Sequence, residues 1–120
     1  ATAATGTGNV DLTERAVNYY TSNASANWTF NFRGDAATTL NNFITTNQSI
    51  TCAFLVTNGS TAYYPTGFQV DGTTTNVNVK WQQGTAPSAG NASSIDAYVF
   101  SIVKTAASTY TILASQTKFA

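Results

Sequence analysis

Short stretches of alternating apolar and polar residues recur along the chain, separated by turns rich in Asn, Gly, Ser and Asp. In the clearest stretch, 27–33, Trp28, Phe30 and Phe32 occupy one set of alternate positions and polar residues occupy the other. Because successive side chains of a strand point to opposite faces, this stretch is predicted to be a strand with one buried aromatic face. Period-two patterning of this kind favours strands over helices for most of the chain.

The same reasoning predicts further strands before and after this one. The expected ranges are 10–14 (weak), 16–21, 49–57, 61–64, 67–70, 76–82, 95–105 and 108–119. Range 49–57 is apolar at nearly every position, which predicts a central strand covered on both faces. Asn58-Gly59 tolerates positive φ and predicts a hairpin turn, whereas Pro65 is expected to end range 61–64 or to mark it as an edge strand. The last two ranges are expected to form a hairpin with residues 106–107 at its tip.

Two segments depart from the strand pattern. Leu40, Phe43 and Ile44 follow the i, i+3, i+4 spacing of a helical face, which predicts a short helix within 36–46 that plugs one end of the sheets. Residues 83–94 are rich in Gly, Ala, Pro, Ser and Asn, and they predict a long loop that is a candidate functional segment.

Eight or nine strands, one short helix and regular turns predict an all-β fold, an antiparallel β-sandwich of jelly-roll-like connectivity. We expect a single sandwich domain over 10–120, preceded by a linker or interdomain strand over 1–9. The 120 residues contain no Met. Either the initiator Met was removed ahead of Ala1 or this sequence is a piece of a longer chain, and we favour the second explanation because residues 1–8 resemble a linker or interdomain strand.

The composition argues against catalysis. There is no His, one Cys, five acidic and five basic residues, and only 8% of positions are charged. Because general acid–base and metal chemistry depend on such side chains, we expect no enzyme, no cofactor and no metal site. The basic residues are dispersed and no apolar run approaches the ~20 residues of a bilayer span, so we expect neither nucleic-acid binding nor membrane insertion. Cys52 lies in an apolar run and is expected to be buried and inert.

Two short motifs invite functional interpretations that the pattern does not favour. Arg33-Gly34-Asp35 spells an integrin-binding tripeptide, but it ends the strongest predicted strand, and we interpret it as a strand end and turn. The five acidic residues follow no Ca²⁺-loop spacing and give no positive sign of a paired-carboxylate hydrolase, so turn and surface roles are expected for them.

Aromatic residues beside amides form the candidate binding site. Tyr63 and Tyr64 precede a proline, and Trp81 is followed by Gln82 and Gln83. Flat rings can stack on the C–H faces of a sugar while amides bond its hydroxyl groups, which makes a saccharide the candidate ligand. The alternative is that Trp81 belongs to the core and that the tyrosines cap a strand edge.

Four segments, over 18–34, 49–64, 80–96 and 113–119, resemble a domain found near the C-termini of virion structural proteins of marine tailed bacteriophages, including cyanophages. Those proteins are often labelled tail fibre or minor structural proteins. The resemblance covers most of the chain from about residue 10 onward, and it supplies no catalytic residues. It implies an extracellular β domain carried on a phage particle in several copies, after a longer N-terminal region.

The leading hypothesis is therefore a structural or adhesive module of a virion, on a tail or head fibre or as a capsid decoration. Its expected partners are other virion proteins, copies of itself in a homotrimer, and a host surface glycan. The alternative is a carbohydrate-binding module or lectin without catalysis. Exposure of Trp81, Tyr63 and Tyr64 together beside Asn or Asp would favour the alternative, and burial of all three would oppose it.

Overall fold

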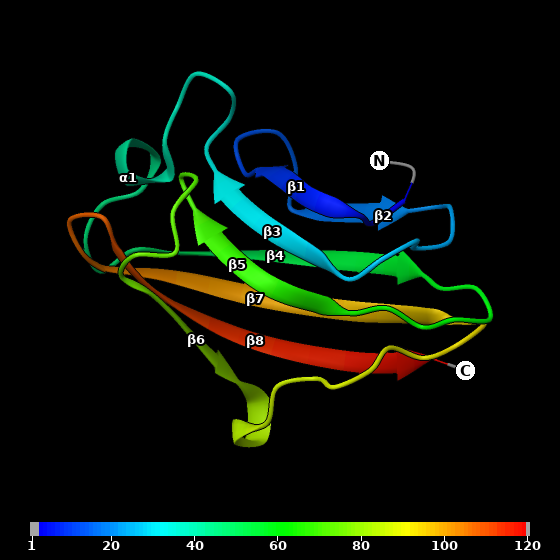
Figure 1. The fold of residues 1–120 in the computed structure, drawn as a ribbon. Helices are drawn as coiled ribbons and strands as arrows, with labels where there is room; N and C mark the ends of the chain where they lie inside the picture. The colour runs from blue at the N-terminus through cyan, green and yellow to red at the C-terminus, as the bar shows by residue number, and fades with distance from the viewer. Residues whose placement is uncertain (1–2, 120) are drawn as a thin grey trace.

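The computed structural model describes residues 3–119, which form two β-sheets packed face to face (Figure 1). The three-stranded sheet has the order β1 (Gly6–Asp11), β3 (Trp28–Arg33), β5 (Pro65–Val70). The five-stranded sheet has the order β2 (Val17–Tyr20), β4 (Ser49–Thr57), β7 (Ile95–Ala106), β8 (Thr109–Phe119), β6 (Val77–Trp81). A short helix, α1 (Leu40–Phe43), and a 3₁₀ turn, η1 (Gln82–Gly84), complete the elements.

The strand directions correct the prediction of an antiparallel sandwich. All pairs of the three-stranded sheet are parallel, as are β2 with β4 and β6 with β8, whereas β4–β7 and β7–β8 are antiparallel. The cause is the path of the chain, which alternates between the two sheets from β1 to β6. Between β1 and β5, each strand of one sheet serves as the crossover between neighbouring strands of the other, so β1, β3 and β5 run in the same direction, as do β2 and β4. The pair β6–β8 is parallel for a different reason, since β7, which connects the two, lies in the same sheet and is antiparallel to β8. Jelly-roll connectivity is not confirmed.

The core lies between the sheets and is built from the aromatic residues of the predicted strand faces. Phe30 is fully buried, with its ring centroid 4.5 Å from that of Phe54 and 5.3 Å from that of Phe100. These three residues come from β3, β4 and β7, so a single aromatic cluster joins both sheets. Cys52 is buried in the same core, and burial raises the pKa of its thiol to about 12.

Several strand ranges differ from the sequence prediction. β1 spans Gly6–Asp11, whereas the first strand was predicted over 10–14, and it pairs with β3. Range 61–64 is not a strand, and Asn58-Gly59 does not close a hairpin, because β4 and β5 belong to different sheets. The last hairpin agrees with the prediction, with β7 and β8 joined through residues 107–108.

The helix closes one end of the sandwich, as predicted, and lies near the β7–β8 turn (Figure 1). Leu40 and Ile44 are buried, but Phe43, expected on the same face, is 41% exposed. The buried Lys104 Nζ of β7 donates to the carbonyl oxygens of Asn41 (2.7 Å) and Ile44 (3.1 Å). The helix is therefore held mainly by side chains from distant strands, since four residues are too few to be stable alone.

Candidate functional site

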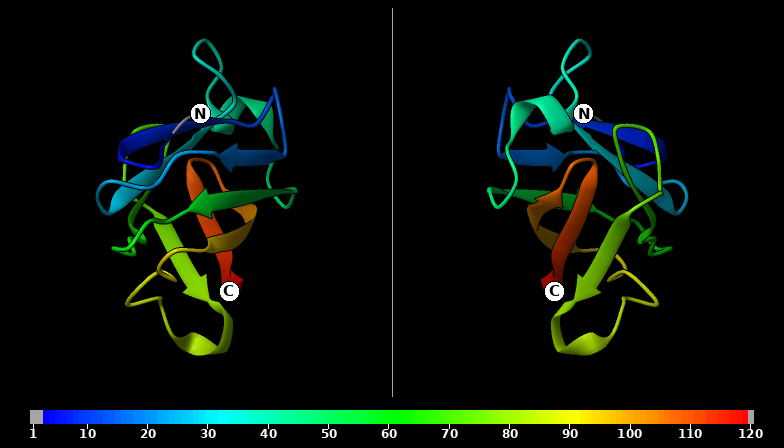
Figure 2. Two further views of the ribbon diagram at one scale, coloured as in Figure 1. Left: turned by 90° about the vertical axis from the view of Figure 1, so that its right-hand side faces the viewer. Right: turned by 90° about the vertical axis from the view of Figure 1, so that its left-hand side faces the viewer.

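Trp81 lies beside a pocket of about 370 Å³ between the loop after β6 and the end of β8. The end-on views place η1 and the C-terminal end of β8 on the side of the molecule away from β1 and β3 (Figure 2). β6 pairs with β8 only as far as Trp81 opposite Ala114, and the chain then turns away through η1. The pocket therefore occupies the space beside β8 where β6 no longer pairs with it.

Trp81 belongs partly to the core and partly to this pocket. Its side chain packs against the core, with ring-centroid distances of 5.7 Å to Phe68 and 6.2 Å to Phe100 and steep interplanar angles of 67° and 74°. The residue is nevertheless only half-buried and lines the pocket. Its contacts with two phenylalanine rings hold the indole in a defined orientation at the pocket wall.

The two tyrosines predicted to accompany Trp81 lie elsewhere. Both are half-buried in the β4–β5 connection, where the backbone N–H of Tyr63 donates to Asn58 Oδ1 (3.2 Å) and that of Tyr64 donates to Asn27 Oδ1 (3.1 Å). Neither tyrosine lines the Trp81 pocket, and among residues 3–119 no ring contact joins them to Trp81. The three predicted residues therefore do not form one stacking platform.

A buried carboxylate anchors the loop that forms the pocket wall. Asp96 is 0% exposed, and its Oδ2 accepts hydrogen bonds from Asn58 Nδ2 (3.1 Å) and from the backbone N–H of Asn91 (2.9 Å). Burial raises the pKa of Asp96, while the Asn91 N–H, the charge of Lys118 and the Asn58 amide oppose that shift. Its Oδ1 is buried without a hydrogen-bond partner in the described part of the chain.

The loop is further fixed on either side of Asn91. Gln116 Nε2 of β8 donates to the Ala89 carbonyl (3.1 Å) and to the Tyr98 hydroxyl oxygen (2.9 Å). A Cβ on Gly90 would lie 2.7 Å from Asn58 Nδ2, so the close approach of loop and network requires glycine. These contacts hold residues 89–91 against the body of the sandwich.

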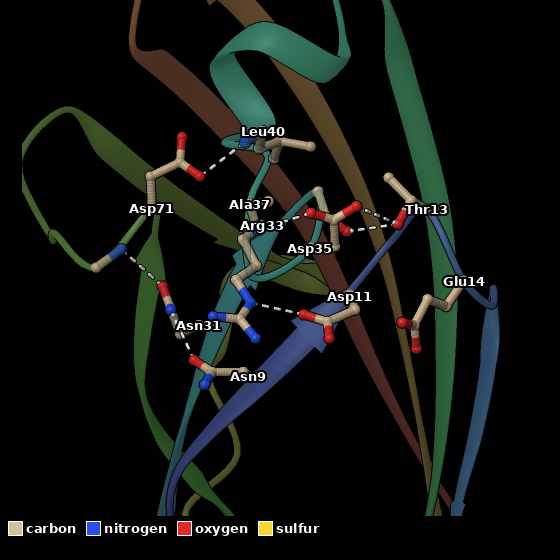
Figure 3. Close-up of polar contacts among 12 residues, drawn as sticks. Asn9, Asp11, Thr13, Glu14, Asn31, Arg33, Asp35, Ala37, Leu40 and Asp71 are labelled. Carbon is tan, nitrogen blue, oxygen red and sulfur yellow. Dashed lines mark hydrogen bonds and ion pairs between the residues drawn. The ribbon is translucent and has the colours of Figure 1, made fainter.

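A second group of polar residues gathers where the three parallel strands end (Figure 3). Arg33 Nε donates to Asp11 Oδ1 at 2.6 Å, and on the same outer face Asn31 Nδ2 donates to Asn9 Oδ1 at 2.9 Å. Asp71, directly after β5, accepts hydrogen bonds from the first backbone N–H groups of α1. Because the carboxyl ends of parallel strands meet at one edge, residues far apart in sequence come together here. The expectation of turn and surface roles for the acidic residues did not include this gathering.

Internal hydrogen bonds account for most of these polar groups. Asp35 accepts from the Ala37 backbone N–H (2.8 Å) and from the Thr13 hydroxyl (3.2 Å), and the Ala37 bond contributes most to lowering its pKa. Asp35 and Asp71 line a cleft of about 320 Å³, but a general acid needs a raised pKa, whereas that of Asp35 is lowered. Arg33 and Asp35 are both tethered, in agreement with the interpretation of this tripeptide as a strand end and turn.

The outer faces of the two sheets differ sharply in chemistry. On the three-stranded sheet, the outward positions in register are Thr7 beside Thr29, Asn9 beside Asn31 and Gln69, and Asp11 beside Arg33. On the five-stranded sheet, about half of the outward positions are apolar, and most of the others are Ser or Thr. Of six large hydrophobic side chains exposed among residues 3–119, five lie on that face: Val17, Tyr19, Val99, Leu113 and Phe119.

Sequence reasoning missed this apolar face for an identifiable reason. The outward positions Ala53 and Leu55 of β4 were visible in the sequence, because range 49–57 is apolar at nearly every position. That signal was interpreted as burial on both faces. In the structure, only one face of β4 and of β7 is covered by the other sheet, and Val99 at the centre of the outer face is 40% exposed.

Comparison with known proteins adds no relative. No protein-family model matches the chain, and neither a curated protein nor a solved structure matches it. Within residues 3–119, no helix has the length and apolar character needed to cross a bilayer, and no group of three or more His, Cys, Asp or Glu side chains is placed to hold a metal ion.

Proposed function

We propose that this domain is a non-catalytic structural module of a bacteriophage virion, displayed on a fibre or capsid surface. In this proposal it packs against copies of itself, in a trimer, and against other virion proteins. The observation that carries the proposal is the apolar outer face of the five-stranded sheet. The resemblance of four sequence segments to virion structural proteins supplies the biological setting.

The apolar side chains are contiguous across four strands. In register across β2, β4 and β7, Val17 lies beside Ala53 and Ala53 beside Val99. The neighbouring row joins Tyr19, Leu55 and Ala97, and Ile95 lies beside Phe119 at the end of β7 and β8. Exposed apolar side chains that are scattered singly need no explanation, whereas a contiguous patch is typical of an interaction surface.

Charge is nearly absent from this face. Among the outward positions of the five described strands, Lys80 at the β6 edge is the one charged side chain, and Ser and Thr fill most of the others. Hydroxyl groups lose less hydration on packing than charged groups do, so desolvation costs little here. Self-association would also meet little like-charge repulsion.

The size of the apolar contribution indicates weak association of isolated domains. The five exposed side chains range from 40% to 60% exposed. Full burial of such a side chain stabilises by roughly 1.5–3 kcal/mol, so covering the exposed half of five contributes about 5 kcal/mol per copy, or about 10 kcal/mol for two copies that pack together. Association costs roughly 4–15 kcal/mol in lost freedom. Stable packing is therefore expected when copies are already held together in an assembly, which suits a particle-borne module.

Sedimentation velocity over a concentration series up to about 1 mM tests the association. We expect the wild-type domain to shift from monomer toward trimer as concentration rises. Val99→Lys places a charge at the centre of the apolar face and is expected to abolish that shift. Thr7→Lys adds the same charge to the polar outer face of the other sheet and serves as the control. A monomer at every concentration, or equal loss in both variants, would contradict self-packing through this face.

The virion assignment has a separate test. Particles are purified from a phage whose genome encodes this sequence, and their proteins are quantified by mass spectrometry. We expect the chain in defined stoichiometry, in a multiple of three copies per fibre or capsid site. Its absence from purified particles would refute the assignment, whatever the oligomeric state of the isolated domain.

A further inference from the structure

We propose that the pocket beside Trp81 binds a sugar unit that carries an acidic group, such as a uronic acid. The pocket has a volume of about 370 Å³, within the range of small-ligand sites. The pocket adjoins the apolar outer face, because Trp81, Gln82 and Ser115 also line a neighbouring hollow together with Val99 and Leu113. The proposal does not depend on the assembly function.

The side chains that line the pocket beside Trp81 favour a saccharide as its ligand. Trp81 lines the pocket together with amide and hydroxyl side chains, among them those of Gln82, Gln83, Ser88 and Ser115, and with the small apolar residues Ala86, Pro87 and Ala89. An indole presents an apolar, electron-rich face, while amides and hydroxyls donate and accept hydrogen bonds in the pattern that sugar hydroxyl groups require. A purely apolar ligand would leave these polar groups without partners.

The single charge in the lining selects an anionic substituent. Lys118 lines the pocket, and no acidic side chain does. The two ion pairs found among residues 3–119 are formed by Arg15 and Arg33, so Lys118 has no ion-pair partner there. Asp96 lies across the strand pair from Lys118, and the charge of Lys118 acts to lower the Asp96 pKa, but no ion pair joins the two side chains among residues 3–119 and Asp96 Oδ2 is engaged by Asn58 and Asn91. The Lys118 ammonium group is therefore available to a carboxylate on a ligand.

The pocket wall is preorganised. Gln83, a non-glycine residue, has φ of 62° and ψ of 16°, the left-handed region that ordinary residues seldom adopt, and Gly84 follows at φ of 75°. This kink turns the chain directly after Trp81. At its far end, the loop is pinned by the hydrogen bonds of Ala89 and Asn91. A rigid wall lowers the entropic cost of binding a small polar ligand.

A peptide strand is the competing occupant, because β8 extends beyond the last residue paired with β6. The loop protects part of that edge. Asn91 Nδ2 donates to the Phe119 carbonyl (3.1 Å), and Gln116 of β8 is bonded to the loop carbonyl of Ala89. A docking strand would have to displace these contacts, whereas a sugar unit would fit beside them.

The test titrates ¹⁵N-labelled protein, at concentrations where it is monomeric, with oligogalacturonate and with neutral cello-oligosaccharides of equal length. We expect saturable shifts of the Trp81 indole N–H and of the Gln82 and Gln83 amides with oligogalacturonate, and weaker binding of the neutral sugar. Lys118→Gln is expected to weaken oligogalacturonate binding about tenfold, because a hydrogen bond to a charged group is lost, and to weaken neutral-sugar binding much less.

Two further variants guard against misinterpretation. Gln82→Ala alters the pocket without touching the core contacts of Trp81, and it is expected to weaken binding of both sugars. Lys80→Gln removes the same charge as Lys118→Gln at a position outside the pocket, and should leave binding unchanged. The proposal is overturned by three results: no saturable shift with either sugar, equal effects of Lys80→Gln and Lys118→Gln, or equal affinities for acidic and neutral sugars. Binding of an unrelated extended peptide at the same amides, without sugar binding, would assign the pocket to peptides instead.

Discussion

Replacing Asp96 by Asn is expected to stabilise the protein at neutral pH. The Asp96 carboxylate is 0% exposed, accepts two hydrogen bonds at Oδ2 and has no partner at Oδ1 among the described residues. Burial raises its pKa, which means that the fold disfavours the ionised form. Asn keeps an acceptor for the two N–H donors and removes the buried charge.

The sign of the pH dependence follows from that raised pKa. Above the unfolded-state pKa of about 3.9, the unfolded chain releases the Asp96 proton more readily than the folded chain does. The contribution of Asp96 to the free energy of unfolding of the wild type is therefore greatest in acid. It falls as pH rises toward the folded-state pKa of Asp96 and is constant above that pKa. The advantage of Asp96→Asn should be absent near pH 3 and fully present at neutral pH.

Two opposing effects set the size of the stability change expected for Asp96→Asn. Leaving a buried polar atom unsatisfied costs about 1–3 kcal/mol, and more for a charged group, but the new amide N–H₂ would itself lack an acceptor at the Oδ1 position. The net gain is therefore expected to be about 1 kcal/mol at pH 7, or about 4 °C in Tm. Asp96→Ala should instead destabilise by about 2 kcal/mol, because it leaves the Asn58 and Asn91 donors unpaired.

Urea denaturation followed by the fluorescence of the buried Trp28, between pH 3 and 8, measures these differences. Asp35→Asn is the control, and its effect on stability should depend on pH in the opposite way. Hydrogen bonds to Asp35, the largest contribution coming from the Ala37 N–H, lower the pKa of its carboxyl group. Its carboxylate contributes stability above the unfolded-state pKa that is lost as pH falls, so Asp35→Asn should destabilise most at neutral pH. If Asp96→Asn is less stable than wild type at pH 7, or its advantage is independent of pH, the reasoning about the buried charge is wrong.

Three further predictions concern the core and the helix. Phe30→Ala removes a fully buried ring at the junction of the two sheets and should cost about 3–5 kcal/mol in chemical denaturation, and a loss below 1 kcal/mol would contradict its central place. Lys104→Ala should cost about 2 kcal/mol in thermal melts, because two carbonyl groups at α1 lose a buried donor, whereas Lys80→Ala should stay within about 0.5 kcal/mol. The Cys52 thiol, with its pKa raised to about 12, should react with a disulfide reagent only after unfolding, and rapid labelling of the native protein at pH 8 would show that the site is open.

Part of the candidate site was visible in the sequence, and part was not. Trp81 and the polar loop after it were identified because an aromatic residue beside amides and a long Gly/Ser/Ala segment are local signals. Lys118 was not identified, because its place in the pocket depends on the packing of β8 against a loop some thirty residues earlier in the chain. Tyr63 and Tyr64 share the local signal of Trp81, but the chain path carries them away from it.

Local alternation was sufficient to locate most strands and the side chains that form the core. β3, β4 and the β7–β8 hairpin lie close to the predicted ranges, because the period-two placement of aromatic and β-branched residues depends only on neighbouring positions. The scarcity of titratable residues is likewise a property of composition. Neither feature required knowledge of which strands are neighbours.

Strand direction, pairing and the identity of the outer faces were decided by long-range packing. A parallel and an antiparallel strand carry the same alternation, so nothing local in β1, β3 or β5 specifies that the chain alternates between sheets and lays them side by side in one direction. Only that path gathers Asp11, Arg33 and Asp71 at one edge. It also leaves the second apolar face of β4 and β7 uncovered, because the other sheet can bury just one side of each strand.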